Sequence, residues 1–512
     1  MFVNLGRDMG KKISTRVALR DLKNISVEII DNVDKWEGLK PQWDSLVAQS
    51  LSPSIFLTYE FLSSAWKALS HESILHILLI KFGKDPLGIV PLKISQRKVY
   101  GIPTKTIEPI ATDIAEKDFF VVLKNESLFY EAFANYLSQN THLWNKLSFF
   151  QLQSDHPFLE AFRNTFSRCR DVIFEERENL VHPCIDISNH WEEYFRNLKP
   201  KFSRKLCNSV QDLCAQGNLT VVKFNDPDKI DKYLELYVGL EERSWKAPMK
   251  SGITRTEDFF KVHKLMLKAC AEKSWVDLTF LLMGSQVIAG GIDVIYDEDF
   301  VYLQTVYDET ASRYNPGTVL MTINVWRAFE KGLKRLHFMG DYAEYKRNWA
   351  NYEWQSYNIS VRERLSGEGL AYYGSKWLKH PVLRVNKKLW KWRRKILRIP
   401  ELAPLTMNHE GVERENVILN NDDIKRIFLL TDGQRKHPEE ESVVCLLPTD
   451  EVERLVAERC SAREKHEWSR ADEIRDYLTQ RGIVINDSPQ GTIWKYSAMQ
   501  ADSPGGSEKM GR

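Results

Sequence analysis

The chain has 512 residues, which is too many for one ordinary hydrophobic core, so we expect two to four domains. Hydrophobic residues make up 43% and charged residues 28%, and these ordinary values exclude a mostly disordered, collagen-like or coiled-coil protein. Lys plus Arg (72) and Asp plus Glu (70) nearly balance, so a nucleic-acid site would have to be a local patch of charge.

Cysteine usage and the start of the chain indicate a reduced compartment. The seven cysteines include no Cys-x-x-Cys pair and no cluster with histidines at zinc spacing, so we predict reduced thiols, a cytoplasmic protein and no metal site. The segment 1–16 lacks the apolar core of a signal peptide, and the longest apolar run, 74–80, is too short to span a bilayer. We therefore expect neither export nor an integral membrane segment.

The first folded unit is predicted at 25–189, after an N-terminal extension at 1–24. Short β-rich runs such as SVEIID and ILHILLIKF alternate there with aromatic amphipathic segments such as FLTYEFLSSAWKAL. This alternation predicts a mixed α/β or α+β domain.

A second unit is predicted at 190–365. It opens with two helical patterns, and the second, KPKFSRKLCNSVQDLCAQG, has Lys201, Arg204 and Lys205 at its start. Three strand-like runs follow, VDLTFLLM, QVIAGGIDVIY and FVYLQTVYD. The short turns between these runs predict an antiparallel meander.

A loop and a helix follow the meander. Asn315 suits the N-cap of that helix, Pro316 its first position and Gly332 its end. The Pro-Gly pair allows a tight turn, and the N–H groups of the first helical turn can face an anion, so the loop has the equipment of a phosphate cradle. The alternative is an ordinary helix start.

The composition changes beyond the second unit, and 366–445 is predicted to be a basic helix and linker. Between Gly369 and Pro400 there are ten Lys or Arg and no acid, with three tryptophans among them. A compact helical piece is predicted at 446–497, and the tail, 498–512, is rich in Gly, Ser and Pro and is predicted to be disordered.

The second unit resembles a known enzyme family in several motifs: the meander, Tyr-Asn-Pro-Gly-Thr-Val-Leu at 314–320, and Tyr345-Lys346 with Trp349. Together with Trp43 and the FLTYEFLSSAW run, they resemble GNAT-fold acyltransferases of the type associated with cellulose-biosynthesis operons. Close relatives are the Fem-type enzymes, which move amino acids from aminoacyl-tRNA to an amine. The resemblance covers about 25–365 and implies an α/β (α+β) fold of tandem GNAT-like halves.

The resemblance implies acyl transfer to an amine, which requires orientation of the reactants, oxyanion stabilisation and proton removal. The candidate catalytic residues are Asp308, Glu309, His337, Asp341, Tyr345 and Lys346. The candidate donor- or phosphate-binding residues are Arg313, Tyr314, Asn315, Pro316, Gly317, Thr318, Trp245 and Lys246. One departure is that His337-Phe338 stands where the family tends to have Asp-Phe.

Structural roles compete with these assignments. Asp308-Glu309 would equally suit a turn after a strand, His337 a satisfied core histidine, and Trp245 and Trp349 the hydrophobic core.

The C-terminal piece resembles the anticodon-binding domain of bacterial cysteinyl-tRNA synthetases through Ala-Asp-Glu-Ile-Arg at 471–475, Arg-Gly-Ile-Val-Ile-Asn-Asp at 481–487 and Pro-Gln-Gly at 489–491. In that family an arginine, a tryptophan and two aspartates read the anticodon, and they correspond here to Arg463, Trp468, Asp472 and Asp487. These residue types suit base recognition by hydrogen bonding and stacking. The alternative is a scaffold that no longer binds RNA. The chain lacks the signature motifs of the synthetase's catalytic half.

The basic stretch between Lys376 and Arg398 is a further candidate surface for tRNA backbone or membrane. Its candidate backbone contacts are Lys388, Lys391, Arg393 and Arg394. Relatives often end in such a helix without an RNA function, so a plain solvent-exposed helix is the alternative.

The leading hypothesis is a tRNA-dependent aminoacyltransferase that needs no cofactor. It would move an aminoacyl group, cysteinyl from cysteinyl-tRNA, to the amine of a small molecule or peptide. A first alternative is an acyl-CoA-dependent N-acyltransferase, either with tRNA as regulator or acceptor or with a vestigial C-terminal tail. A second is a non-catalytic protein that binds cysteine tRNA.

Overall fold

The structure is a computed structural model, and it describes residues 24–111, 114, 119–154, 156–339, 344–378, 403–407, 416–429, 449–464, 468–479, 483–488 and 491–496. The chain divides into two compact units, Met1–Leu430 and Thr431–Arg512.

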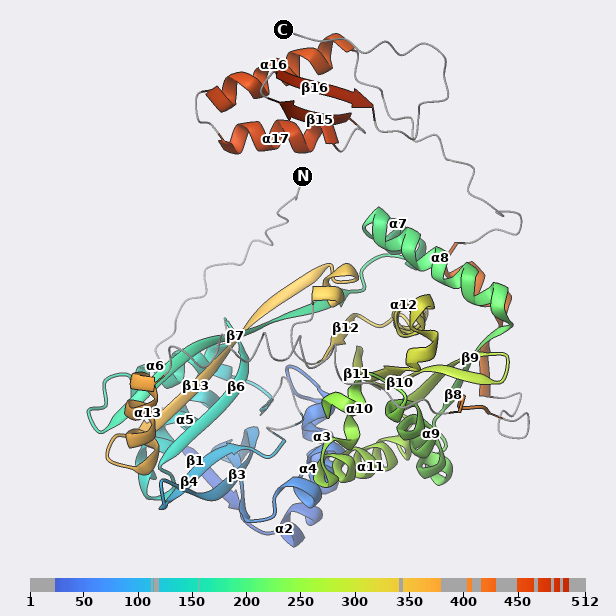
Figure 1. The fold of residues 1–512 in the computed structure, drawn as a ribbon. Coiled ribbons are helices and arrows are strands. Elements are labelled where there is room, and N and C mark those ends of the chain that lie inside the picture. Colours follow the sequence, from blue (N-terminus) through green and yellow to red (C-terminus); the bar gives the residue numbers. More distant parts are fainter. Residues whose placement is uncertain are drawn as a thin grey trace. The chain divides into compact units, whose positions relative to one another are not determined.

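A continuous sheet runs through the first unit (Figure 1). Its strands are β1 (Ile25–Ile30), β2 (Ser73–Phe82), β3 (Asp85–Val99), β4 (Ile102–Pro109), β5 (Val121–Val122), β6 (Lys146–Gln153), β7 (Val172–Asp186), β8 (Leu219–Phe224), β9 (Val276–Met283), β10 (Gln286–Tyr296), β11 (Asp299–Tyr307), β12 (Arg335–Phe338), β13 (Tyr352–Glu363) and β14 (Val417–Leu419). Their order is β1-β2-β3-β4-β6-β13-β7-β12-β11-β10-β9-β8-β14, and β5 pairs with β3.

The two halves of the sheet have the same plan. Each half has an antiparallel meander followed by a helix and a strand parallel to the meander's last strand: β6 pairs with β4, and β12 pairs with β11. The final strand of each half then crosses to the other half, so that β13 lies beside β6 and β7 lies beside β12. β7 and β13 also pair with each other from Tyr352 opposite Cys184 to Glu363 opposite Val172. Each half therefore completes the sheet of the other.

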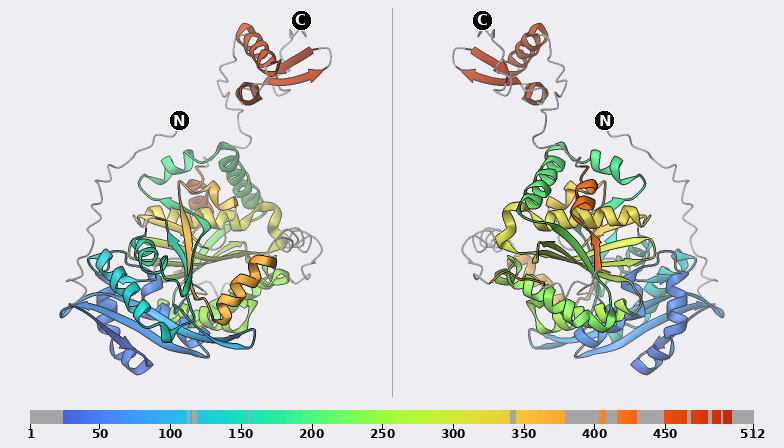
Figure 2. Two further views of the ribbon diagram at one scale, coloured as in Figure 1. Left: turned by 90° about the vertical axis from the view of Figure 1, so that its left-hand side faces the viewer. Right: turned by 90° about the vertical axis from the view of Figure 1, so that its right-hand side faces the viewer.

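Helices cover both faces of this sheet (Figures 1 and 2). They are α2 (Val33–Gly38), α3 (Lys40–Ala48), α4 (Tyr59–Leu69), α5 (Glu126–Gln139), α6 (Pro157–Phe166), α7 (Trp191–Arg196), α8 (Pro200–Gln216), α9 (Ile230–Glu242), α10 (Lys246–Met249), α11 (Glu257–Ala271), α12 (Pro316–Glu330), α13 (Gly367–Leu378) and α15 (Asn421–Ile427). No helix of these described ranges is long and apolar enough to cross a membrane.

The core follows the alternation of side chains along the strands. In β11, Phe300 and Tyr302 belong to one apolar cluster, with α7, α8, α12 and α15, whereas Val301 between them belongs to another, with α9 and α11. The second cluster extends into the first half of the sheet, where α4 packs against α11. Thus α8 and α12 lie on one face of the second half, and α9 and α11 lie on the other.

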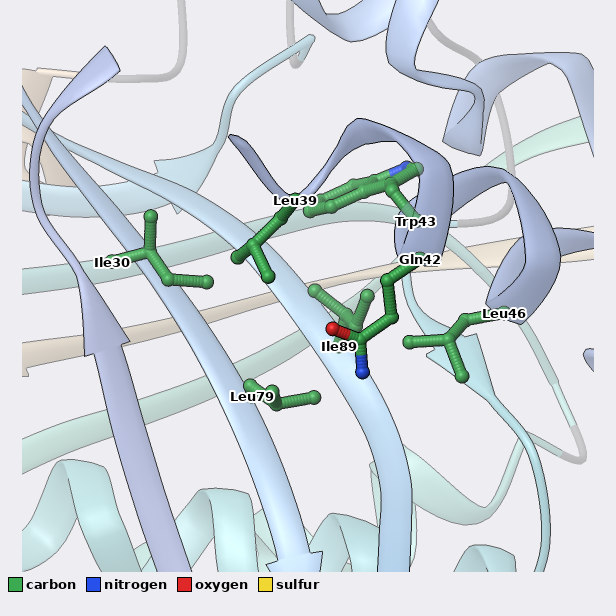
Figure 3. A pocket seen from close by; sticks show the side chains of 7 residues that line it. All are labelled: Ile30, Leu39, Gln42, Trp43, Leu46, Leu79 and Ile89. Carbon is green, nitrogen blue, oxygen red and sulfur yellow. The ribbon is translucent and has the colours of Figure 1, made fainter. Parts of the chain in front are cut away.

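A small void lies beneath α3 in the first half (Figure 3). It measures about 10 Å³ and is lined by Ile30, Leu39, Gln42, Trp43, Leu46, Leu79 and Ile89. That is about the space of one water molecule, so the void offers no room for a substrate.

The predicted mixed α/β fold with tandem halves is confirmed. The three predicted strands of the meander are β9, β10 and β11, and α12 begins at Pro316 directly after Asn315. The helix ends at Glu330, two residues before Gly332, whose φ of +63° stops it.

Parts of the predicted linker differ from expectation because they belong to the first unit. β14 pairs with β8, and the Trp191 indole donates a hydrogen bond of 2.8 Å to the Ile427 carbonyl. Leu405 accepts one from the Val287 amide at 2.8 Å. These segments attach through backbone hydrogen bonds and a few apolar side chains, which leave no long hydrophobic period in the sequence.

The second unit is a small α+β module. It contains α16 (Thr449–Glu464), α17 (Trp468–Thr479) and the antiparallel strands β15 (Ile483–Ser488) and β16 (Gly491–Tyr496). Its apolar core joins the two helices through Val452, Leu455, Val456, Ile474 and Leu478.

The strand exchange predicts that the two halves of the first unit cannot fold separately. Residues 24–189 would lack β13 between β6 and β7, and residues 190–430 would lack β7 between β12 and β13. We expect each fragment alone to aggregate or to lack cooperative unfolding, and the co-expressed fragments to purify as a 1:1 complex. Light scattering and thermal unfolding followed by circular dichroism would test this. Two monomeric fragments with cooperative transitions near that of the intact unit would contradict it.

Candidate functional site

The parallel strands β11 and β12 separate at the candidate site. Their pairing ends at Tyr302 opposite Phe338, where β12 stops. β11 continues to Tyr307, so residues 303–307 have no partner in β12. Backbone groups on the edge of a strand that has no strand partner can hydrogen bond to a bound molecule, so this edge of β11 is a candidate place for a substrate.

Lys246 lies beside this part of β11. Its amine donates a hydrogen bond of 2.8 Å to the Gln304 side-chain carbonyl, in the part of β11 that pairs with β10 but not with β12. Burial lowers the pKa of Lys246 to about 8, Glu241 opposes that shift, and the charge of Lys346 adds to it. The structure thus brings a predicted donor-site residue to β11, with an amine whose charge changes near pH 8. Trp245 precedes it, partly buried.

Glu241, which the sequence analysis did not identify, supports this corner. Its buried carboxylate accepts hydrogen bonds from the Ile253 amide at 2.8 Å and the Thr254 amide at 3.0 Å. A Cβ on Gly252 would lie 2.0 Å from the Glu241 carboxyl carbon, so only glycine fits there. The carboxylate is fixed in position by this turn.

Lys346 and Tyr345 come from the turn η6 (Glu344–Asn348) after β12. The buried Lys346 amine donates a hydrogen bond to the Met339 carbonyl, just past the end of β12. The Tyr345 side chain is 49% exposed and lies edge-on to Trp349, with 6.3 Å between ring centroids. Trp349 is buried, and its indole donates to the Thr322 hydroxyl at 3.1 Å, as a core residue would.

His337 joins the two halves of the sheet. Its Nε2 lies 3.1 Å from an Asp299 carboxylate oxygen in β11, and its Nδ1 lies 3.4 Å from the Cys184 sulfur in the exchanged strand β7. The three side chains are buried. The Asp299 carboxylate also accepts a hydrogen bond of 2.9 Å from the Arg335 guanidinium, so it holds both side chains of β12 in place. Sequence reasoning missed Asp299 and Cys184 because they lie on other strands.

Asp308 and Glu309 differ in their surroundings. One Asp308 oxygen accepts hydrogen bonds from the Thr310 amide at 2.9 Å and its hydroxyl at 2.7 Å, and so caps the turn η5 (Glu309–Tyr314). Glu309 has a buried carboxylate oxygen that accepts no hydrogen bond from the described residues. Glu309 therefore has a buried oxygen that can still accept a hydrogen bond.

Several polar groups of the predicted anion loop already form hydrogen bonds with other protein groups. The Asn315 carbonyl accepts from the amides of Thr318 and Val319 at 2.9 and 3.1 Å, and its side-chain amide donates to the Ser209 hydroxyl at 3.0 Å. A Cβ on Gly317 would lie 2.9 Å from the Tyr307 ring. The glycine therefore permits close packing, and two N–H groups of the first helical turn are already bonded.

Tyr314 and Pro316 are buried, whereas the Arg313 side chain is exposed. Arg313 and Asn315 line a surface pocket of about 310 Å³ between the loop and α8. The rest of its lining comes from one helix: Lys201, Arg204, Lys205, Asn208, Ser209 and Asp212. The structure thus combines the predicted loop with the predicted basic helix.

The predicted anticodon residues lie in the second unit. Arg463 is partly buried near the end of α16, and the exposed Asp472 pairs with Arg475 at 2.8 Å in α17. Trp468 is the first residue of α17, and Asp487 lies in β15. The predicted backbone contacts Lys388, Lys391, Arg393 and Arg394 lie outside the described residues, as does Asp341.

Comparison with protein families assigns a domain to each unit. Residues 200–347 match the family model described as "Acetyltransferase (GNAT) domain". Residues 448–494 match the model described as "Cysteinyl-tRNA ligase anticodon binding domain". The protein joins these two domains in one chain. Both predicted resemblances are confirmed at this level.

Two cysteine–tRNA ligases match a short part of the chain. The cysteine–tRNA ligase of Geobacter metallireducens is 55% identical over 49 residues, which are 10% of this chain and 10% of that protein. That of Methylobacillus flagellatus is 53% identical over 57 residues, or 11% and 12%. The chain thus spans about a tenth of the length of these relatives.

Solved structures match about two thirds of the chain at low identity. FemX is 11% identical, covering 65% of this chain and 96% of its own, with a TM-score of 0.44. A tandem GNAT protein from the clavulanic acid biosynthesis pathway is 11% identical, covering 65% and 98%, with a TM-score of 0.36. L-PGS from Bacillus licheniformis is 9% identical, covering 62% and 90%, with a TM-score of 0.39. At these scores the likeness says nothing about activity.

The lowered pKa of Lys246 predicts a pH-dependent stability effect in the GNAT domain. Below pH 8 the amine is charged in the folded protein at a desolvation cost, and between pH 8 and 10.5 only the unfolded chain keeps the proton. Because the unfolded state then binds more protons, stability rises with pH in this window. We expect Lys246→Met to stabilise the protein at pH 7, with an advantage that shrinks from pH 8 to 10.5.

Urea unfolding at pH 7 to 10 would measure this difference. Lys268→Met, which removes an exposed lysine of α11, is the matched control. An advantage of Lys246→Met that is equally large at pH 7 and pH 10 would contradict the assignment.

Proposed function

We propose that this protein is a tRNA-dependent aminoacyltransferase with cysteinyl-tRNA as its donor. The amine of a small molecule or peptide would attack the ester that links the amino acid to the 3′ end of the tRNA. The products would be an amide and free tRNA. The observation that carries this proposal is the presence of an anticodon-binding domain of the cysteinyl-tRNA ligase type on a chain with a GNAT domain.

The reaction makes limited chemical demands. An ester is already activated toward amines, so no further energy source or cofactor is needed. The enzyme must hold the carbonyl beside the amine, stabilise the oxyanion and accept the amine's proton. The gap between β11 and β12 would hold the ester, with the amines of Lys246 and Lys346 as positive charges nearby.

The proton would go to Nδ1 of His337, which faces the Cys184 sulfur, while Nε2 stays hydrogen-bonded to the Asp299 carboxylate. It would then pass to the departing 3′ oxygen of the tRNA. In this account Asp299 is a positioning residue and His337 is the catalytic base.

The anticodon-binding domain would choose the tRNA. Arg463 and Asp472 can hydrogen bond to base edges, Trp468 can stack on a splayed base, and Asp487 can accept from an exocyclic amino group. Recognition at the anticodon would select the tRNA that carries cysteine, without any contact to the small cysteine side chain. Such an enzyme would work in the cytoplasm, where aminoacyl-tRNA is made.

A second candidate donor is an acyl-CoA. The matched family model is described as an acetyltransferase domain, which favours this donor. The anticodon-binding domain would then serve regulation, or tRNA would be the acceptor.

A transfer assay with the full-length protein tests these donors side by side. We expect label to move from ³⁵S-cysteinyl-tRNA to a pooled set of amines and peptides, and no transfer from acetyl-CoA. Transfer from acetyl-CoA alone would establish the second candidate. If neither cysteinyl-tRNA nor acetyl-CoA transfers its acyl group to any of the amines, the result would support a protein that only binds tRNA.

The same assay tests the assigned base. His337→Gln should lower kcat/KM by about 100-fold or more, the usual contribution of a general base. His142→Gln, which replaces an exposed histidine, is the matched control. A His337→Gln rate within twofold of the wild type would exclude His337 as the proton acceptor.

A further inference from the structure

Helix α8 presents a polar, mostly basic stripe to solvent. Lys201, Arg204, Lys205 and Asn208 are spaced as neighbours on one helical face, and all are exposed. The opposite face packs into the core through Leu206, Val210 and Leu213. The stripe is thus an accessible surface on a firmly packed helix.

The positive charge of this stripe is not neutralised within the described part of the chain. None of Lys201, Arg204 and Lys205 forms an ion pair with a described carboxylate. Arg313, across the pocket, contacts the hydroxyl and ring of Tyr314 instead of an acid. Asp212 is the single acid among the residues that line this pocket.

The position of these charges on the helix adds to the effect. The basic residues lie in the first two turns of α8. The first turn of this helix contains no acidic residue. The helix macrodipole already makes this end positive, so cations there oppose the usual stabilising pattern. An anion bound in the pocket would relieve this repulsion.

The length of the stripe indicates how many phosphates it can contact. Seven residues separate Lys201 from Asn208, which is roughly 10 Å of α-helix at about 1.5 Å per residue. A stripe of this length is long enough to contact more than one phosphate of a nucleic-acid strand. The pocket of about 310 Å³ is large enough for groups of this size.

The pocket is also connected to the candidate active site. The Asn315 side chain donates to Ser209 in α8 at 3.0 Å, and the loop that bears it follows β11 directly. A chain of phosphates held along α8 could therefore end near the gap between β11 and β12.

We infer that the α8 pocket binds consecutive phosphates near the acceptor end of a tRNA, as a second RNA contact independent of the anticodon. This inference rests on the proposed function for the identity of the RNA. It assigns the pocket a positioning role: it directs the aminoacylated end toward the gap while the anticodon-binding domain selects the tRNA.

The test uses the full-length protein and an uncharged RNA hairpin that copies the acceptor stem and 3′ end of cysteine tRNA and has no anticodon. Lys201→Ala/Lys205→Ala removes two stripe cations. The matched control, Lys232→Ala/Lys268→Ala, removes two exposed lysines from α9 and α11 on the other face of the sheet. Thermal unfolding would verify that both variants are folded.

We expect the stripe variant to bind the hairpin about tenfold or more weakly at 0.1 M salt, and the control to bind as the wild type does. The slope of log K against log salt should also decrease by about 1.4 to 1.8, because each lost phosphate contact removes about 0.7 to 0.9. Unchanged hairpin affinity and slope would overturn the inference.

A CoA titration distinguishes the other source of phosphates. If the stripe variant loses CoA binding and keeps hairpin binding, the pocket is a nucleotide-cofactor site and the inference fails. The proposed function fails separately if the wild type transfers no cysteinyl group yet still binds the hairpin through the stripe. Normal transfer with stripe-independent hairpin binding would overturn this inference alone.

Discussion

The reciprocal exchange of β7 and β13 is the constraint on which the rest of the first unit depends. Because these strands pair with each other and with the opposite halves, the sheet is continuous and its central register is fixed by both halves together. A slip of one residue would turn every side chain of β7 to the other face. The contact of Cys184 with His337 is therefore a consequence of the exchange.

This arrangement places the candidate site at the edge of the second half, where the pairing of β11 and β12 ends. β12 is short and pairs with β7 on one side and β11 on the other, which fixes its position. Its pairing with β11 ends at Tyr302, so β12 gives the rest of β11 no partner on that edge. Two lysines lie close to this end of the pairing, Lys246 from α10 on Gln304 and Lys346 from the turn after β12 on Met339, whereas His337 and Asp299 lie within the paired part of β11 and β12. A rigid sheet with a local gap suits transfer between two bound molecules, because it orients them without having to move.

Much of the fold could be predicted because its elements have local signatures. Short apolar runs separated by turn residues indicate β9 to β11, and Asn-Pro-Gly indicates the start of α12. The exchange could not be predicted in this way, since Cys184 and Tyr352 are brought together by pairing rather than by any nearby pattern. The same holds for β14, a three-residue strand within a polar stretch.

The site shows a similar division. Arg313, Asn315 and the basic start of α8 could each be identified from residue type, but their shared pocket depends on how α8 packs beside the loop. Glu241 and Asp299 are ordinary acids within regular elements, and only their buried contacts mark them. The anticodon-binding domain was readable from sequence because several separated motifs of one module occur together.

The central claim is that the anticodon selects the donor, and the most direct measurement is the affinity of the full-length protein for cysteine tRNA at fixed salt. The comparison RNA is the same tRNA with an altered anticodon, and the comparison protein carries Asp472→Ala and Asp487→Ala. The account predicts about 10- to 100-fold weaker binding of the altered tRNA, because each base-specific contact contributes about 1–3 kcal/mol. The protein variant should lose this discrimination. Equal, salt-sensitive binding of both tRNAs by the unaltered protein would contradict the account.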